Sequence, residues 1–434
     1  MGQRLDRRVD AERDAIVALT RALVAIPTIN PPGDAYEPCV RLIGDRLARR
    51  GFDVRYIRAE GAPGDSDRYP RVNVVARREG GAPGPTVHFN GHVDVVEVGS
   101  GWTVDHFGGE VRDGRVYGRG TCDMKGGLAS AIVAAECFAA EHPDHPGALE
   151  ISGTVDEESG GFGGVAHLAR IGILARPRVD HVIIPEPLDV DRICLGHRGV
   201  WWAEIETRGS IAHGSMPFLG DCAVRHMGAV VARMERDLWP ALSERRTRMP
   251  VVPDGAAAAT LNVNAIHGGE AEHFDGLPSP NVPHACRMTI DRRFLAEETL
   301  DGVRGEMVAL LDGLRIERPG FDYALRDLMT VQPTMTDAEA PVVRALDASI
   351  RDVLGRAPEH VASPGTYDHK HVARLGHIED CVAYGPGILE MAHRPDEFVV
   401  IDDMVASAKV MARTLDTLLR GGRPDGHMPR REEP

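Results

Sequence analysis

The sequence of 434 residues has no long apolar run and no internal repeats. No stretch approaches the roughly 18 apolar residues that a membrane helix requires. The first residues, MGQRLDRRVDAERDA, are charged throughout and lack the apolar stretch of an export signal. Asp6 stands where a myristoylation signal would have Ser or Thr. We therefore expect a soluble protein that is neither exported nor anchored to a membrane.

Cysteine and positive charge are also scarce. Seven cysteines are odd in number and widely spaced, with no C-x-x-C pair, so we expect buried thiols in a reducing compartment and a cytoplasmic protein. Their positions are Cys39, Cys122, Cys137, Cys194, Cys222, Cys286 and Cys381. Fifty basic against 65 acidic side chains give a formal charge of −15, which repels phosphate backbones and anionic lipids. We expect neither a nucleic-acid nor a membrane partner.

The two ends of the chain alternate helices and strands. Helical spacing from 8 to 26 and an Ala-rich helix at 125–141 accompany the apolar segments TVHFN, LEISGTV and HVIIP, which are typical of strands. This alternation predicts an α/β fold with a layered, mostly parallel sheet. We assign residues 1–196 and 332–434 to this domain and expect the tail from about 421 to be disordered.

The middle of the chain has another rhythm. Strand-like segments VWWAEIETRG, TLNVNAIHGG, PHACRMTIDRR and FDYALRDLM are interleaved with helices at 222–238 and 297–312. Their order, β-α-β-β-α-β, predicts an α+β domain inserted at 197–331, with its sheet covered on one face.

Imidazole and carboxylate side chains gather where apolar segments of the first domain end. They are His92, Asp94, Asp123, Glu157, Glu158, Glu186 and His393. Open α/β sheets place their sites at the carboxyl ends of parallel strands, so we expect these residues to converge on one edge. In an extended His92-x-Asp94 segment the two side chains share a face, which lets a carboxylate orient a metal-binding histidine.

Charge counting is consistent with two metal ions. Asp123, Glu158 and Glu186 supply three negative charges, which together with one hydroxide balance two divalent cations bound also by neutral histidines. Adjacent Glu157 and Glu158 point in different directions on an extended backbone, so one can ligate while the other acts as a base. Nitrogen and oxygen donors favour Zn, Mn or Co. On residue types alone, a solvated turn of charges at DEES remains the alternative.

Together these residues resemble the signature of the dinuclear metallohydrolases that include acetylornithine deacetylase, succinyl-diaminopimelate desuccinylase, aminoacylase and glutamate carboxypeptidases. The resemblance spans roughly residues 10 to 415 and includes the run WTVDHFGGEVRDGRVYGRG. It implies that Asp123 bridges the two metals. His92 and Glu186 would hold one ion, and Glu158 and His393 the other.

The resemblance also implies roles outside the ligands. Glu157 would be general base and then acid, and Asp94 would orient His92. The insert resembles the family's lid and dimerisation domain, so we expect a homodimer formed through 197–331. His213 in GSIAHGS resembles a histidine that reaches the other subunit's site and stabilises the oxyanion.

Substrate contacts are implied at four further positions. Asn264 and Arg292 resemble lid residues that contact the substrate, and Arg292 suits a bidentate grip on a carboxylate, with Arg293 as a competing choice. Gly365 and Thr366 match part of a Gly-Gly-Thr motif that also contacts the substrate in the family.

The stretch SPGTYDHK departs from the family pattern. Members usually carry Gly-Gly-Thr with a nearby arginine, whereas here Pro364 precedes the glycine and His369 and Lys370 follow. This departure leaves the substrate open. We expect His369, His371 and His377 to be solvated helix positions rather than ligand contacts.

The leading functional hypothesis is metal-dependent hydrolysis of an amide bond in an N-acyl amino acid or a similar small carboxylate. Release of ammonia from an aromatic amine, as in 5-nitroanthranilate aminohydrolases, is the alternative on the same scaffold. A non-catalytic metal-dependent binding protein is disfavoured by Glu157, because binding needs no base.

Overall fold

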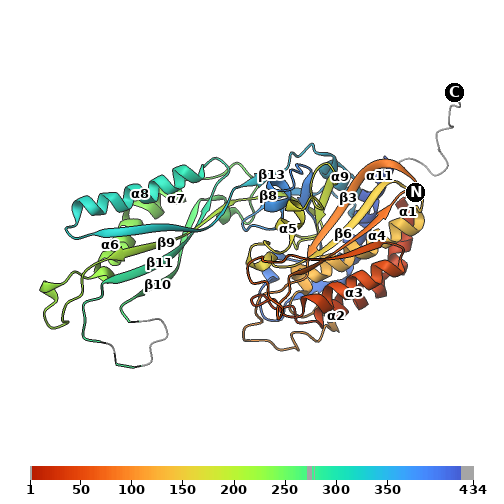
Figure 1. The fold of residues 1–434 in the computed structure, drawn as a ribbon. Coiled ribbons are helices and arrows are strands. Elements are labelled where there is room, and N and C mark those ends of the chain that lie inside the picture. Colours follow the sequence, from red (N-terminus) through yellow and green to blue (C-terminus); the bar gives the residue numbers. More distant parts are fainter. Residues whose placement is uncertain (1, 271–275, 278, 422–434) are drawn as a thin grey trace. The chain divides into compact units, whose positions relative to one another are not determined.

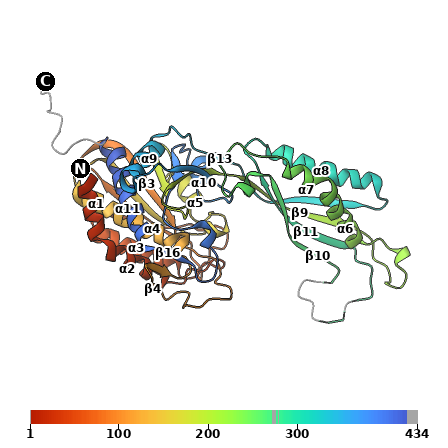
Figure 2. The same ribbon diagram turned by 180° about the vertical axis from the view of Figure 1, so that it is seen from behind.

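The structure is a computed structural model that describes residues 2–270, 276–277 and 279–421 (Figures 1 and 2). The chain divides into two compact units. Unit 1 comprises residues 1–196, 336–361 and 367–434, and unit 2 comprises 197–335 and 362–366. The tail that we expected to be disordered, 422–434, lies outside the described residues.

Segment 362–366 corrects the expected domain boundary, because it packs with unit 2 rather than with the α/β domain. Ala362 forms a β-bridge with Val251, and the Arg198 guanidinium donates hydrogen bonds to the carbonyl of Pro364. Gly365 and Thr366 therefore lie in unit 2.

The helices of unit 1 largely follow the sequence pattern. They are α1 (Gly2–Ala11), α2 (Arg13–Val24), α3 (Tyr36–Arg49), α4 (Gly126–Glu141), α5 (Val165–Arg170), α9 (Pro341–Leu354), α10 (His369–Arg374) and α11 (Ile401–Arg420). The single opening helix expected from 8 to 26 was wrong: the chain is helical from Gly2 and breaks at Glu12. The sequence gives no sign of this break, because no Gly or Pro stands at Glu12 and the apolar periodicity continues across it.

Unit 1 contains a large mixed sheet with parallel strands at its centre. Its strands are β1 (Asp53–Arg58), β2 (Val72–Glu79), β3 (Ala82–His92), β6 (Pro146–Thr154), β7 (His181–Ile184), β8 (Arg192–His197), β14 (Glu359–Ser363) and β15 (Cys381–Ala383). Their order is β1-β2-β6-β3-β7-β15-β8, with β14, whose last two residues belong to unit 2, paired to β8. β6, β3, β7 and β15 are mutually parallel. The predicted layered α/β fold is confirmed. A small separate sheet joins β4 (Glu110–Arg112), β5 (Arg115–Tyr117) and β16 (Phe398–Val400).

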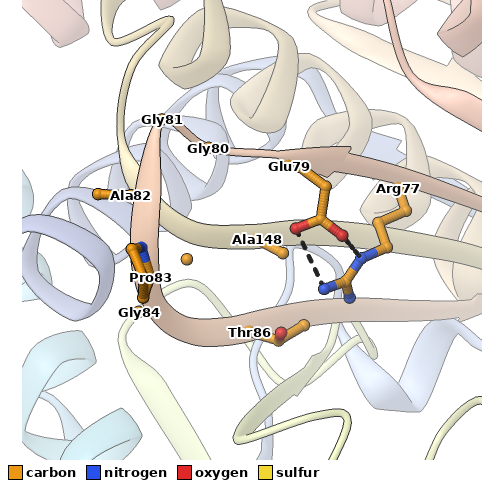
Figure 3. Close-up of a pocket in the computed structure, with 10 residues that line it drawn as sticks. Arg77, Glu79, Gly80, Gly81, Ala82, Pro83, Gly84, Thr86 and Ala148 are labelled. Carbon is orange, nitrogen blue, oxygen red and sulfur yellow. Dashed lines mark hydrogen bonds and ion pairs between the residues drawn. The ribbon is translucent and has the colours of Figure 1, made fainter.

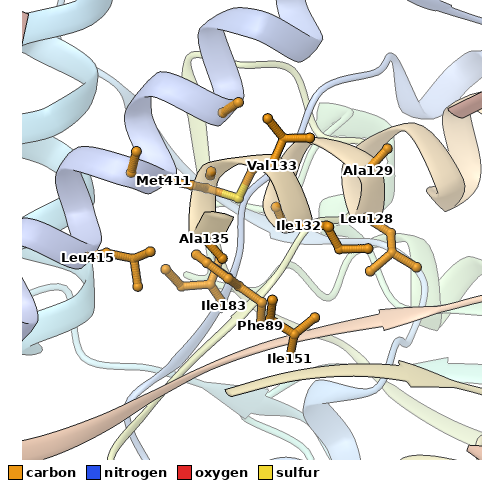
Figure 4. Close-up of a cluster of buried hydrophobic side chains, with 14 of the residues drawn as sticks. Phe89, Leu128, Ala129, Ile132, Val133, Ala135, Ile151, Ile183, Met411 and Leu415 are labelled. Atoms are coloured by element: carbon orange, nitrogen blue, oxygen red, sulfur yellow. The ribbon is translucent and has the colours of Figure 1, made fainter. Parts of the chain in front are cut away.

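One face of the large sheet is apolar and carries the core. Phe89 of β3 and Ile151 of β6 are fully buried against α4 and α11 (Figure 4). Burying each such side chain stabilises the fold by about 1.5–3 kcal/mol. Every residue of α4 from Gly126 to Ala139 is buried, which is what an Ala-rich helix between a sheet and other helices requires.

The opposite face of the same strands is polar yet also buried. His88 pairs with Glu150, and Asn90 with Ser152, as cross-strand neighbours of β3 and β6, and all four side chains are inaccessible. Because side chains alternate along a strand, these residues share their face with His92, the last residue of β3. The polar face therefore leads to the first expected ligand.

Close packing brings a second expected ligand to this end of the sheet. A side chain at Gly127, in the first turn of α4, would collide with the carbonyl oxygen of Pro185, just beyond β7. Only glycine permits this approach. It sets the segment that carries Asp123 beside the segment that carries Glu186.

Unit 2 follows the predicted β-α-β-β-α-β order, with a further short helix before the second strand and a two-residue strand at the end. Its main elements are β9 (Gly199–Arg208), α6 (Ala223–Arg233), α7 (Trp239–Ser243), β10 (Thr260–Gly268), β11 (Ala285–Phe294), α8 (Leu300–Glu317), β12 (Asp322–Val331) and β13 (Thr334–Met335). The antiparallel sheet has the order β10-β11-β9-β12. α6 and α8 share a core with the buried side chains of β9 and β11, including Trp201.

Two further findings concern the chain as a whole. None of the described helices combines the length and apolarity needed to cross a membrane. All seven cysteines lie among the described residues and none of them forms a disulfide; six are buried as expected, whereas Cys222 is half-buried.

Candidate metal centre

The five expected ligands come from different segments at one end of the unit 1 sheet. His92 ends β3, Glu158 lies in the short turn Glu157–Ser159 that follows β6, and Glu186 follows β7. Asp123 lies in the turn Thr121–Lys125 that opens α4, and His393 precedes β16. We call these five residues the ligand edge.

The ligand edge forms two groups that share one residue. His92, Asp123 and Glu186 offer one ligand atom each within 4.8 Å of one another. Asp123, Glu158 and His393 do the same. His92 Nε2 lies 3.1 Å from Asp123 Oδ1, whereas His393 Nε2 lies 3.4 Å from Asp123 Oδ2. The two oxygens of one carboxylate thus face two separate groups, which is the arrangement of a bridging ligand.

The electrostatics of the ligand edge favour bound cations. Burial raises the pKa of Glu158 to about 7, and burial together with the charge of Asp123 raises that of Glu186 well above its ordinary value. Hydrogen bonds to Asp123 and Glu158 raise the pKa of His393 to about 10. Buried acids that retain protons and imidazoles that gain them both indicate a cluster that attracts positive charge. Three carboxylates and two imidazoles match the donors that Zn, Mn and Co accept.

Asp94 ties two of these segments together. His92 Nδ1 lies 3.0 Å from the main-chain carbonyl oxygen of Asp94 and 3.6 Å from its carboxylate. That carboxylate accepts hydrogen bonds from the backbone N–H groups of Glu157 and Glu158, at 3.2 and 3.1 Å, and from the side chain of Asn30. One buried carboxylate therefore contacts the end of β3 and also holds the turn that carries the expected base.

Glu157 stands apart from both ligand groups. Its Oε1 accepts a hydrogen bond from Lys370 Nζ at 3.0 Å. Glu158 instead contacts His393, 3.1 Å away. The two neighbouring glutamates therefore have different partners.

Two residues of this region were missed by the sequence analysis. The carboxylate of Glu397, fully buried, accepts the backbone N–H groups of Cys122 and Asp123 at 2.9 and 3.1 Å. Arg119 pairs with Glu397 at 2.6 Å and also donates to the carbonyl of His393. Each residue lies four positions from a ligand, but this spacing is equally typical of surface charges and gave no usable signal.

The histidines of the departing stretch also differ from expectation. His369 is buried and His371 is half-buried, so the expected solvated helix positions were wrong for both. His371 Nε2 lies 2.7 Å from the carbonyl oxygen of Gly160. Burial lowers the pKa of each imidazole to about 3, so both are neutral near pH 7. His377 is exposed but lies beyond α10.

The residues expected to contact substrate lie in unit 2. His213 is exposed and its Nδ1 accepts hydrogen bonds from Ser215, and exposed Asn264 accepts one from Asn262. Arg292 is buried and its guanidinium pairs with Glu298 at 2.6 Å. The competing Arg293 likewise pairs, with Asp291 at 2.8 Å. Neither arginine presents an unpaired guanidinium to a substrate carboxylate.

Gly365 and Thr366 are half-buried, and the backbone N–H of Gly365 donates to Ser363 Oγ at 3.2 Å.

A cavity of about 360 Å³ lies at the start of β3, around Ala82 and Thr86, whereas the ligand edge lies at the end of that strand (Figure 3). Arg77 and Glu79 pair with each other beside it. The cavity contains none of the expected ligands.

Comparison with known proteins identifies the family of this chain. The profile of Peptidase family M20/M25/M40 matches residues 88–417. The succinyl-diaminopimelate desuccinylase of Stenotrophomonas maltophilia is 30% identical over 414 residues, which cover 93% of this chain and 99% of that protein.

Solved structures show the same fold at lower identity. Human carnosine dipeptidase 1 superposes with a TM-score of 0.76 at 18% identity and covers 96% of this chain and 99% of its own. The YXEP protein of Bacillus subtilis, a dinuclear metal-binding peptidase, superposes with a TM-score of 0.67 at 14% identity and covers 95% of this chain and 99% of its own.

Proposed function

The chain belongs to peptidase family M20/M25/M40 and is a metal-dependent hydrolase of carbon–nitrogen bonds, and from this premise we propose that it removes the acyl group from an N-acylated amino acid at a dinuclear centre. The observation that carries the proposal is the position of Asp123, whose two oxygens face two ligand groups while Glu157 stays outside both. Five ligands and one separate base are what hydrolysis requires, whereas binding requires only the ligands.

The proposed ligand set is divided by geometry. His92, Asp123 and Glu186 would hold one divalent ion, and Asp123, Glu158 and His393 the other. Zn, Mn or Co fits these nitrogen and oxygen donors. Such ions, when bound, polarise a carbonyl group and make water more acidic.

The residues of the chain supply the proton transfers. Glu157 takes the proton of the attacking water and afterwards gives it to the departing amine, so that one carboxylate serves as base and then as acid. Asp94 keeps Glu157 in reach by binding its backbone N–H. His213, exposed on unit 2, is proposed to stabilise the oxyanion in the site of a partner subunit.

The substrate class follows from the relatives. The desuccinylase covers nearly this whole chain and acts, by its name, on a succinylated diamino acid. We propose a substrate that carries a carboxylate close to the scissile amide. Asn264, Gly365 and Thr366 remain the proposed substrate contacts, whereas Arg292 would first have to leave Glu298.

Exposed apolar side chains support a homodimer formed through unit 2. Ile211, Phe218 and Leu219 are 60%, 79% and 66% exposed, and Ile266 on the edge strand β10 is 51% exposed. Strongly exposed large apolar side chains can be covered by a second copy of the chain. Seven cysteines that form no disulfide support a reducing compartment, and we propose the cytoplasm.

A substrate screen tests the proposal. The purified protein, loaded in turn with Zn, Mn and Co, is offered N-succinyl and N-acetyl amino acids, dipeptides and aminobenzoates, and free amine, carboxylic acid and ammonia are measured separately. We expect the carboxylic acid and an amino acid in equal amounts. Ammonia from an aminobenzoate, with no acyl amino acid cleaved, would replace deacylation by the aromatic aminohydrolase reaction.

A further inference from the structure

The polar face of the unit 1 sheet forms a continuous chain of buried contacts. His88 Nδ1 lies 3.0 Å from Glu150, and His88 Nε2 lies 2.7 Å from Ser152 Oγ. Ser152 donates to Asn90 Oδ1 at 2.7 Å. We call His88, Asn90, Glu150 and Ser152 the polar ladder. Buried polar groups that satisfy one another in this way fix a single arrangement of the side chains.

The polar ladder ends on Asp368, just before α10. Asn90 Nδ2 donates to Asp368 Oδ2 at 3.1 Å, and Asp368 is 1% exposed. Among the described residues, Asp368 Oδ1 has no hydrogen-bond partner. A Cβ added to Gly161 would lie 2.8 Å from this oxygen, so it faces the loop that follows Glu157. The ladder thus holds a buried carboxylate beside the loop of the proposed base.

The negative charges of Glu157 and Asp368 both act on the ammonium group of Lys370. Lys370 is 4% exposed, and its Nζ lies 3.0 Å from Glu157 Oε1. Burial lowers the pKa of Lys370, but Glu157 and Asp368 outweigh burial and leave the pKa above its ordinary value. A buried ammonium needs such partners to stay charged.

Lys370 binds one carboxylate oxygen of Glu157, Oε1, and makes no hydrogen bond to the other, Oε2. Among the described residues, Lys370 is the one side chain that donates a hydrogen bond to the Glu157 carboxylate, and it binds Oε1. Orientation of a catalytic group within tenths of an ångström strongly affects rate.

We propose that Lys370 is a positioning residue for Glu157, whose carboxylate it orients by binding Oε1. This inference rests on the proposed function, in which Glu157 is the base. It assigns a role to the stretch SPGTYDHK, where the sequence departs from the family pattern. In this proposal the changed residues of that stretch affect how the base is oriented, and not only which substrate is bound.

Substitution of Lys370 in the metal-loaded, full-length protein tests the proposal. We expect Lys370→Met to lower kcat by about 10²-fold, as loss of effective general-base catalysis would, with KM within about three-fold of wild type. Metal content should stay near wild type, because Lys370 belongs to neither ligand group. Lys370→Arg should recover part of the loss, and methylammonium should raise the rate of Lys370→Ala in a saturable manner.

Controls separate positioning from structure. Lys409→Met removes another lysine–carboxylate pair, with Asp10 at 2.6 Å, and should leave kcat unchanged. Asp368→Asn keeps the side-chain shape and should lower kcat less than Lys370→Met does. Wild-type kcat in Lys370→Met, or loss of metal together with activity, would overturn the positioning role.

A crystal structure of Lys370→Met gives a readout that does not depend on activity. We expect the Glu157 side chain to leave its wild-type rotamer while the ligand edge stays in place. An unmoved Glu157 would overturn the inference even if the substitution slowed the enzyme. If no substrate is hydrolysed by wild type, the proposed function fails, whereas the Glu157 rotamer still decides the role of Lys370.

Discussion

The ligand edge of unit 1 and the expected substrate contacts of unit 2 differ in where their side chains find partners. On the ligand edge, His393 contacts Glu158 and Asp123, which lie far from it in the sequence. In unit 2, His213 contacts Ser215 and Arg292 contacts Glu298, both close by in sequence. Long-range contacts bring the ligand edge together within unit 1, whereas the local contacts of His213 and Arg292 do not by themselves assemble a site.

This difference predicts that disturbing unit 1 has the larger effects. Removal of the metals should have the largest. Dialysis against a chelator should lower turnover by more than about 10⁴-fold, because both the polarised carbonyl and the acidic water depend on the ions. Mn, Zn or Co should restore it. Full turnover in a sample shown to be metal-free would contradict the dinuclear centre.

Substitution of the base should come next. Glu157→Gln should lower kcat by about 10²- to 10⁴-fold with two metal ions per chain retained, since Glu157 lies outside both ligand groups. Glu158→Gln is the matched control, because it should lose metal as well as activity. Metal analysis with steady-state kinetics distinguishes the two. If Glu157→Gln loses metal, Glu157 is a ligand rather than the base.

The Arg119–Glu397 pair should have an intermediate effect. Glu397→Gln leaves the buried Arg119 without its charged partner and weakens the hold on the backbone of Asp123. We expect metal affinity to fall about 10- to 100-fold, as for other outer-sphere partners, and stability to fall by about 3 kcal/mol. Exposed Glu390, in the same loop, provides the control Glu390→Gln. Calorimetric titration with metal should separate the two variants, and equal affinities would remove the supporting role of Glu397.

The proposed action of His213 across a dimer tests whether unit 2 completes a site elsewhere. Inactive Glu157→Gln and His213→Ala proteins, mixed in equal amounts, should regain about a quarter of wild-type activity, because half of the dimers are mixed and each has one intact site. Native mass spectrometry should establish that mixed dimers form. Mixed dimers without activity would argue against action in trans.

Arg292 should have the smallest effect on catalysis. Because its guanidinium pairs with Glu298, we expect Arg292→Lys to lower the free energy of unfolding by about 1–3 kcal/mol and to change KM by less than about three-fold. The sequence-based expectation of a carboxylate grip predicts instead a rise in KM. Thermal unfolding and kinetics on one preparation decide between the roles. A ten-fold rise in KM with unchanged stability would indicate that Arg292 binds the substrate carboxylate.

Much of the fold could be predicted because it depends on local patterns. Alternation in TVHFNGH and LEISGTV fixes which residues of β3 and β6 face the helices, and the β-α-β-β-α-β order defines the sheet of unit 2. The break at Glu12 could not be predicted, since periodicity continues across it. The placement of 362–366 with unit 2 could not be predicted either, because it depends on a bridge to Val251, more than a hundred residues away.

The sequence by itself determined the types and order of the proposed ligands and their places near strand ends, because parallel strands bring their carboxyl ends to one edge. Only the tertiary structure decided how these residues face one another. Asp123 presents one oxygen to each ligand group, Lys370 binds Glu157 across 213 positions, and Glu397 pairs with Arg119 across 278. Such contacts depend on how distant segments pack, and no local spacing encodes them.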